Sequence, residues 1–419
     1  MASSYASMWE SLLPVGRNPR TGGYQRLAYS SAELACREWF VAAAQERHME
    51  VDTDRNGNLW AWRDQGSGDA SRNNALVIGS HLDSVRDGGA FDGPLGVVSS
   101  FAAIDQLRES GEDPSRPLAV VAFADEEGAR FGIACAGSRL LTGQLDADEA
   151  RALRDDDGVS MAEAMRSAGH DPTHLGHDEA LLAQIGAYVE LHVEQGRGLV
   201  DLNEPVGLAS SIWPHGRYRF DFAGEANHAG TTRMVDRHDP VQVWARTAAS
   251  AEAVALAHDA RATFGRVEVS PNATNAVPSL LNAWLDARAA DQQTLGEMLA
   301  EIEHVAMTEG QRAGVRVKVT VESETSAVEF DASLRTQLAT ALGSTSTQAG
   351  FAANLPVLPT GAGHDAGVLS NVGIPTAMLF VRNPTGVSHS PAEFAEPDDC
   401  LAGVSALATV VSALTNRQD

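Results

Sequence analysis

Mainly apolar runs separated by helix-length stretches dominate the first half of the chain. Residues 75–79 (ALVIG), 118–124 (LAVVAFA) and 188–193 (YVELHV) have the length of buried strands, and residues 95–107 have that of a helix. Strands with little polar alternation are typical of parallel sheets that helices cover on both faces. This half therefore predicts an α/β fold with a mixed, largely parallel sheet.

The pattern changes after about residue 210. Residues 217–222 (RYRFDF) alternate polar and aromatic side chains, as in a strand with one solvated face. Asp239 and Pro240 supply an N-cap and a first-turn proline for a helix. The expected elements are this helix to about Ala257, strands near 263–270 and 280–286, a helix over 292–307 and a strand at 315–321.

Two domains follow from these two patterns. We expect residues 210–327 to form an inserted α+β domain of the β-α-β-β-α-β type. Residues 1–209 and 328–419 are expected to form the α/β domain, since alternating helices and strands return after Phe330 and residues 376–381 (TAMLFV) make a last clear strand.

Composition and charge limit the partners. The chain has 56 Asp plus Glu against 31 Lys plus Arg, a formal net charge of −25. Such a surface repels phosphate backbones, so we expect no nucleic-acid partner. Cys36, Cys135 and Cys400 form no CxxC pair, which fits a reducing compartment. With no signal-peptide pattern and no apolar run near ~20 residues, we expect a cytoplasmic protein that does not enter membranes.

The strongest chemical signal follows the first buried strand, where residues 79–93 read GSHLDSVRDGGAFDG. Loops after buried strands are where α/β proteins place ligand sites. His81 and Asp83 lie two positions apart, so one can bind a metal while the other orients the imidazole. Asp92, followed by Gly93 at a tight turn, can bridge two metals with its two oxygens. Taken alone, a polar turn explains the same residues.

Residues 125–131 (DEEGARF) follow the second buried strand. Adjacent carboxylates at a strand end point in different directions. One of Glu126 and Glu127 can therefore bind a metal while the other acts on a water molecule, a division that suits metal-assisted hydrolysis. The alternative for this segment alone is a solvated acidic loop.

Two further clusters complete the candidate set: residues 190–196 (ELHVEQG) at a third strand end, and residues 388–391 (SHSP) after the last strand. Together the clusters offer nitrogen and oxygen ligands and no thiolate, which suits two divalent ions such as Zn²⁺ or Mn²⁺. The candidate ligands are His81, Asp92, Glu127, His192 and His389.

Competing chemistries lack their motifs. The sequence has no G-x-S-x-G elbow, no Walker A loop, no H-E-x-x-H and no G-x-G-x-x-G. Cys135 has no histidine nearby in sequence, so we expect it to be a buried packing residue.

In combination these motifs resemble the M20 metallopeptidase family, and within it the hydantoinase/carbamoylase group of amidohydrolases. The resemblance runs from residue 21 (TGGYQR) to residue 391, and its other specific segments are GEANHAGTT at 224–232 and GAGHDA at 361–366. It implies hydrolysis of the ureido C–N bond of a small acid, allantoate or an N-carbamoyl-L-amino acid, by a homodimer. The two metals would be Zn²⁺ or Mn²⁺, with Co²⁺ or Ni²⁺ as alternatives.

The resemblance also implies a role for each matching residue. The five candidate ligands match the metal ligands, with Asp92 bridging; Asp83 orients the first histidine and Glu126 is the general acid/base. His228 matches a histidine of the lid and dimerisation domain, here residues 210–327, that reaches the partner's active site. The implied substrate contacts are Gln195, Asn275, Arg288, His215 and Gly363.

Two positions depart from the family pattern. Relatives commonly have a proline where this chain has Arg233, and a glutamine where it has His215. Both departures concern the substrate-facing side of the lid by analogy, so they affect the choice of substrate and leave the metal chemistry unchanged. An aminoacylase or dipeptidase of the same family and a catalytically silent ligand-binding homologue are the alternative functions.

Overall fold

The computed structural model describes residues 2–63, 72–112, 114–349 and 354–416. The chain divides into two compact units. The first consists of Met1–Ser210 and Glu329–Asp419, and the second of Ser211–Val328. Each unit is built around its own sheet and hydrophobic core.

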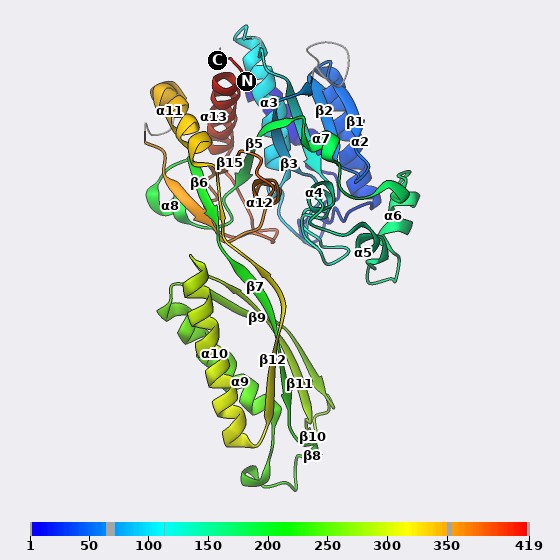
Figure 1. Ribbon diagram of the computed structural model, residues 1–419, viewed down its shortest axis with the longest axis vertical. Helices are drawn as coiled ribbons and strands as arrows, with labels where there is room; N and C mark the ends of the chain where they lie inside the picture. Colours follow the sequence, from blue (N-terminus) through cyan, green and yellow to red (C-terminus); the bar gives the residue numbers. More distant parts are fainter. Residues whose placement is uncertain (1, 64–71, 113, 350–353, 417–419) are drawn as a thin grey trace. The chain divides into compact units, whose positions relative to one another are not determined.

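The first sheet is mixed and largely parallel in its centre (Figure 1). Strands β4, β3, β5 and β15 pair in parallel, whereas β2 and β6 pair antiparallel with β4 and β15. The strand order is β1 (Glu50–Thr53), β2 (Leu59–Arg63), β4 (Leu118–Phe123), β3 (Ala75–His81), β5 (Ile185–Val193), β15 (Thr376–Val381), β6 (Val206–Ile212) and β13 (Val328–Glu329), with β14 (Val357–Thr360) paired to β6.

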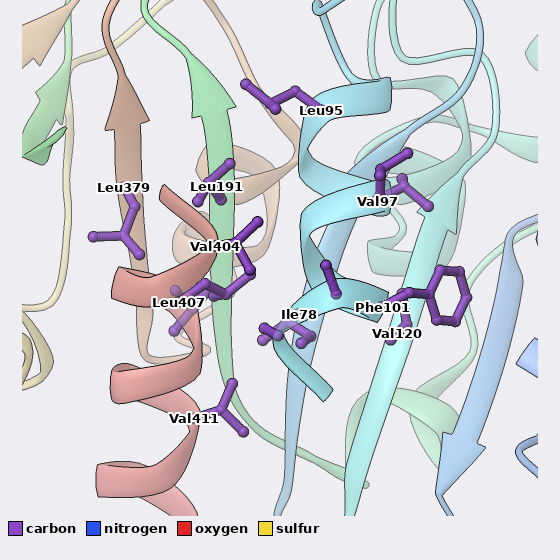
Figure 2. Close-up of a cluster of buried hydrophobic side chains, with 14 of the residues drawn as sticks. Ile78, Leu95, Val97, Phe101, Val120, Leu191, Leu379, Val404, Leu407 and Val411 are labelled. Carbon is purple, nitrogen blue, oxygen red and sulfur yellow. The ribbon is translucent and has the colours of Figure 1, made fainter. Parts of the chain in front are cut away.

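Helices cover both faces of this sheet, as the sequence predicts, so the α/β fold class is confirmed. On one face α3 (Pro94–Glu109) and α13 (Pro397–Thr415) pack over apolar strand residues, and Figure 2 shows Phe101 and Val404 in one cluster with Ile78, Val120 and Leu191. On the other face α12 (Asp365–Asn371) packs against β5, β15 and α4 (Ala136–Thr142). The completely buried strands β3, β4 and β15 explain the continuous apolar runs in the sequence.

The remaining helices of the first unit lie around this core. They are α1 (Ala2–Leu12), α2 (Ser31–Glu46), α5 (Ala147–Ala152), α6 (Met161–Ser167), α7 (Glu179–Leu182), α8 (Gly198–Leu202), α11 (Ala332–Ala349) and the 3₁₀ turn η2 (Pro172–His174). Among the described residues, α13 alone is long and apolar enough to cross a membrane, and 67% of its apolar window is buried inside the protein. Its side chains are part of the central core. A buried core helix can have the same length and apolar composition as a helix that crosses a membrane.

The second unit contains a four-stranded antiparallel sheet in the order β12–β7–β11–β9, with two helices on one face. Its main elements follow the β-α-β-β-α-β order, and a two-stranded pair, β8 with β10, is added to them. The bounds are β7 (His215–Ala223), β8 (Asn227–His228), η3 (Met234–Asp236), α9 (Pro240–Ala257), β9 (Arg261–Ser270), β10 (Ala276–Val277), β11 (Leu280–Arg288), α10 (Gln292–Ala313) and β12 (Arg316–Thr325).

Helix α10 is longer than predicted, since it continues past Met307 to Ala313. Buried Ile302, Ala306 and Gly310 keep the helical spacing on the face toward the sheet. Gly314 then adopts a left-handed conformation (φ 65°) and ends the helix.

Gly96 gives a test of how closely α3 approaches the sheet. A Cβ at this position would lie 2.3 Å from the Leu191 carbonyl oxygen and 2.7 Å from the Ser80 Cβ. Because both belong to central strands, we expect Gly96→Ala to lower the free energy of unfolding of this unit by about 1–3 kcal/mol. Calorimetric melting measures this. The control is Gly296→Ala on the exposed side of α10, where nothing lies within 4 Å; an equal loss there would contradict the packing argument.

Candidate metal centre

The carboxylate of Asp92 lies between two groups of candidate ligands. Its Oδ1 is 3.1 Å from His192 Nε2 and 3.6 Å from His81 Nε2. Its Oδ2 is 3.4 Å from His389 Nε2, and that nitrogen is 3.3 Å from Glu127 Oε2. Two three-residue groups with metal-ligand spacing therefore share Asp92, one on each oxygen.

Neighbouring parallel strands bring these residues together. His81 is the last residue of β3, His192 lies near the end of β5, and Glu127 follows β4. Both histidines belong to the strands themselves, so the expectation that His81 lies in the loop is wrong, because β3 continues two residues past the predicted end at Gly79. Gly93 after Asp92 has φ 84°, and a Cβ there would lie 2.4 Å from the His81 ring. The turn that presents Asp92 to the histidines thus requires glycine.

The hydrogen bonds of His81 and His192 fit one cation beside Asp92 Oδ1. His192 Nδ1 is 2.9 Å from the Val193 carbonyl oxygen and His81 Nδ1 is 3.2 Å from the Asp83 carbonyl oxygen, so when each ring is neutral its proton lies on Nδ1. The Nε2 lone pairs then face Asp92, and among the described residues neither Nε2 atom has a hydrogen-bond partner. Lone pairs facing a buried carboxylate oxygen are stabilised by a cation between them. The donor set is suited to such an ion.

The charged side chains of this cluster shift one another's pKa values. Burial by itself raises the pKa of Asp92, but contacts with His192, His389 and His81 outweigh it and hold that pKa well below its ordinary value. Burial, together with the charge of Asp92, raises the pKa of Glu127 to about 7. The hydrogen bond to Asp92 raises the pKa of His389 to about 9. Divalent ions would replace the protons that this arrangement otherwise holds.

Glu126 lies beside the cluster and is directed by Asp83. The Asp83 carboxylate accepts hydrogen bonds from the backbone N–H groups of Glu126 (3.2 Å) and Glu127 (3.1 Å), and its Oδ1 is 3.5 Å from His81 Nδ1. Glu126 Oε2 is 3.6 Å from His81 Nε2. Burial raises the pKa of Glu126 well above its ordinary value, and the neighbouring carboxylates Asp365 and Glu127 add to the increase.

Cys135 is buried, as predicted, but it has a polar partner. Its thiol lies 3.5 Å from Glu126 Oε1, so Oε2 is the oxygen that faces His81. The residue has φ 55° and is the N-cap of α4, and its N–H donates to the Glu126 carbonyl oxygen (2.6 Å). The contact was not predicted because a lone cysteine in the sequence gives no sign of a turn that brings it back to residues 125–128 (DEEG).

Several buried polar residues around the ligands were not singled out from sequence. His364 stacks edge-on against His192, with ring centroids 4.5 Å apart, and forms a further group of ligand-spaced atoms with His192 and Glu190. Glu190 accepts hydrogen bonds from the Ser80 hydroxyl and the Ala366 N–H. In the sequence, only their positions within residues 190–196 (ELHVEQG) and 361–366 (GAGHDA) could have pointed to them.

The predicted substrate contacts are distributed over both units. In the first, Gln195 Nε2 donates to Asp92 Oδ2 (2.8 Å), and exposed Gly363 precedes the buried His364. The other three predicted contacts lie in the second unit, where they and the predicted lid histidine His228 form two pairs. His215 is the register partner of Arg288, and the N–H after His228 donates to the Asn275 carbonyl oxygen.

These two pairs lie at opposite ends of the second sheet. His215 begins β7, whereas His228 follows the far end of that nine-residue strand, in the β8–β10 pair (Figure 1). At a rise of about 3.4 Å per residue the pairs are roughly 25–30 Å apart. Arg288 makes a bidentate ion pair with Asp286, with Nε–Oδ1 at 2.7 Å and Nη2–Oδ2 at 3.0 Å. His228 Nδ1 accepts from the N–H groups of Gly230 and Thr231.

Comparison with known proteins places this arrangement in a family. The model of peptidase family M20/M25/M40 matches residues 77–413. This chain belongs to that family. It is 35% identical to the N-carbamoyl-L-amino acid amidohydrolase of Geobacillus stearothermophilus, covering 96% of each chain. It is 32% identical to the allantoate amidohydrolase of Bacillus subtilis (strain 168), covering 92% of this chain and 91% of that one.

A solved structure is similar to this chain over its whole length. A hydantoinase/carbamoylase family amidase from Burkholderia multivorans superposes with a TM-score of 0.85 at 26% identity, covering 100% of this chain and 99% of the other. The resemblance inferred from the motifs is therefore confirmed, and the M20 protein is a hydrolase. The M20 family is metal-dependent, and the ligand-spaced groups around Asp92 are this chain's candidates.

Metal binding to the M20 protein should release protons. His389, with a pKa of about 9, is protonated at neutral pH, and it can ligate only after losing that proton. Apparent affinity should therefore rise by up to about tenfold per pH unit from pH 7 and level off above about pH 9, while Glu127, with a pKa of about 7, adds dependence below neutrality. Titration calorimetry of Mn²⁺ in buffers of different ionisation enthalpy measures the protons released.

The matched variant is His389→Gln, which cannot take up a proton. We expect weaker binding and a smaller release of protons between pH 7 and pH 9, because the pKa values of His81 and His192 are also raised. A wild-type affinity that is flat over this range, with no proton release, would contradict the assignment of His389 as a ligand.

Proposed function

We propose that this protein is a cytoplasmic homodimeric amidohydrolase that cleaves the ureido C–N bond of a small acid and releases ammonia and CO₂. The substrate is allantoate or an N-carbamoyl-L-amino acid. The observation that carries the proposal is the two-sided environment of Asp92 with Glu126 beside it. The names of the relatives, an N-carbamoyl-L-amino acid amidohydrolase and an allantoate amidohydrolase, support the substrate class.

Two divalent ions are the proposed cofactors, Zn²⁺ or Mn²⁺, with Co²⁺ or Ni²⁺ as alternatives. His81 and His192 would hold one ion with Asp92 Oδ1, and Glu127 and His389 would hold the other with Oδ2. Bound there, the ions would polarise the ureido carbonyl and make a water molecule more acidic.

Glu126 is the proposed general base and acid. Its buried carboxylate has a raised pKa, so it binds a proton more strongly than an ordinary glutamate. It takes the proton of the attacking water at Oε2 and passes it to the departing nitrogen. Asp83 supports this role because it holds the backbone of Glu126 and the ring of His81 with one carboxylate.

The substrate contacts have complementary chemistry. A guanidinium such as Arg288 can bind a carboxylate with two parallel hydrogen bonds. Because Asp286 already holds this guanidinium, a substrate carboxylate would have to compete with Asp286, and a substrate without a carboxylate would not bind there. Asn275 and His215 would lie at the substrate's other polar groups, as would Gln195 and the backbone of Gly363. With Nδ1 accepting from backbone N–H groups, the ring of His228 carries its proton on Nε2, where it can stabilise a developing oxyanion.

The arrangement of the second unit supports a dimer. A ureido acid is much shorter than the distance between the His228 and Arg288 ends of the sheet. One substrate molecule can therefore contact both residues only if they come from two copies of the chain. We propose that each active site takes its histidine and its arginine from different subunits.

The function is tested by the products of the Mn²⁺-loaded protein. Allantoate and several N-carbamoyl-L-amino acids should release ammonia, whereas an N-acetyl amino acid and a dipeptide should release no amine. Turnover of allantoate alone identifies an allantoate amidohydrolase, and broad N-carbamoyl turnover identifies a carbamoylase. Amine release from only the acetyl or peptide substrates would replace the proposal with an aminoacylase or dipeptidase. A protein that binds no divalent ion and turns over no substrate would be a silent homologue.

The base is tested by Glu126→Gln, which keeps the size of the side chain. We expect kcat to fall by about 10³-fold with metal content unchanged, since the proton transfer is lost while the ligands remain. Metal analysis of the same preparation is the control. Near wild-type turnover with both ions bound would remove Glu126 from this role.

Shared active sites are tested by mixing two inactive variants. His228→Ala and Arg288→Ala should each lower kcat/KM about 100-fold or more, the first through lost oxyanion stabilisation and the second through lost substrate binding. Co-expressed in equal amounts, they should recover about a quarter of wild-type activity, because half of the dimers are mixed and each has one intact site. The control is the same two proteins combined at the moment of assay. Absence of recovery in purified mixed dimers would contradict the two-copy site.

A further inference from the structure

Glu393 is a buried carboxylate behind the candidate metal centre, with only 4% of its surface exposed. Its Oε1 accepts hydrogen bonds from the backbone N–H groups of Phe91 (2.9 Å) and Asp92 (3.0 Å). Gly89 makes room for it, since a Cβ there would lie 2.2 Å from the same oxygen. One oxygen of Glu393 is thus committed to the loop that carries Asp92.

The other oxygen of Glu393 reaches Asp92 through a hydroxyl. Ser388 Oγ lies 2.9 Å from Glu393 Oε2 and 3.1 Å from Asp92 Oδ2. Gln195 Nε2 lies 2.8 Å from Asp92 Oδ2 and 3.2 Å from Ser388 Oγ. The carboxylates only accept and the amide nitrogen only donates, so the single hydroxyl proton of Ser388 can go to Glu393 or to Asp92, but not to both.

We propose that Glu393 is a positioning residue that draws the Ser388 hydroxyl proton away from Asp92. With the Gln195 amide on one lone pair of Oδ2, the other lone pair is then available for a cation. This inference rests on the proposed two-ion site. The shorter hydroxyl contact is the one to Glu393. A cation on Oδ2 would also repel a proton directed at that oxygen, so binding and the orientation of the hydroxyl favour each other. Glu393 thereby acts on the Glu127 and His389 side of Asp92.

Replacing Glu393 by glutamine reverses this hydrogen bond. Two backbone N–H groups require an acceptor at Oε1, so the amide nitrogen must take the Oε2 position and donate to Ser388 Oγ. The hydroxyl proton then turns toward Asp92 Oδ2 and competes with a cation there. Oδ1, which faces His81 and His192, is not contacted by Ser388.

The experiment is a two-site Mn²⁺ or Zn²⁺ titration of the metal-free, full-length protein, with a competing chelator. Glu393→Gln should weaken one of the two ions about 10- to 100-fold and the other by less than about threefold. Adding Ser388→Ala to that variant removes the competing proton and should restore most of the lost affinity. A purely structural role for Glu393 predicts a further loss in the double variant, because a second hydrogen-bonding group has been removed.

Ser388→Ala alone provides a test that does not depend on the folding of the glutamine variant. Because the hydroxyl proton points to Glu393 in the wild type, its removal should change both affinities by less than about threefold. A change of tenfold or more would overturn the proposal, as would unchanged affinities in Glu393→Gln or failure of the double variant to recover.

A matched control is Glu194→Gln. Glu194 is also a buried carboxylate that accepts two backbone N–H groups, those of Gly198 (2.6 Å) and Leu199 (2.9 Å) at the start of α8. We expect this variant to lose stability and keep both metal affinities. The titration uses metal alone, so it tests the role of Glu393 separately from the substrate. If the protein binds two ions but releases no ammonia, the proposed substrate is wrong, and the titration of the Glu393 variants still decides the role of Glu393. A wild type that binds fewer than two ions would overturn both proposals.

Discussion

The requirement to keep one buried carboxylate charged between three imidazoles governs the first unit. Asp92 is 5% exposed, and its two oxygens face His192 and His81 on one side and His389 on the other. An isolated buried charge is very unfavourable, so the surroundings must supply compensating charge and hydrogen bonds. Gly93 allows the turn that places Asp92, the Gln195 amide donates to its carboxylate, and its own backbone N–H donates to Glu393. The parallel strands β3 and β5 bring His81 and His192 to the same edge of the sheet, beside this carboxylate.

A second constraint is the excess of buried acid in the same place. Glu126, Asp125 and Asp365 are buried near the ligands, and burial raises the pKa of each well above its ordinary value. Cations at the Asp92 groups would offset this charge, and a carboxylate left with a raised pKa beside them is suited to moving protons. The centre therefore has the two features that the proposed metal-assisted hydrolysis needs, candidate ligands for ions and a carboxylate, Glu126, that lies outside both ligand groups on Asp92.

The second unit contributes a different kind of organisation. Its antiparallel sheet holds His215 opposite Arg288 at one end, while the short β8–β10 pair holds His228 near Asn275 at the other. The sheet thus acts as a spacer between two polar pairs, each of which is held by local backbone contacts. This separation gives a physical reason for expecting two copies of the chain to serve one substrate.

Local pattern in the sequence determined the elements and most of the candidate ligands. Completely buried strands appear as apolar runs, Asp239 and Pro240 mark the start of α9, and strand-end motifs contain His81, Asp92, Glu127, His192 and His389. The family followed from the combination of motifs. Tertiary structure alone decided which oxygen of Asp92 faces which histidine, and that Cys135 meets Glu126. It also decided that Glu393 reaches Asp92 through Ser388, across about 300 residues of chain. The physical reason is that periodicity reports burial along one element, whereas hydrogen-bond direction and charge compensation depend on atoms brought together from separate strand ends.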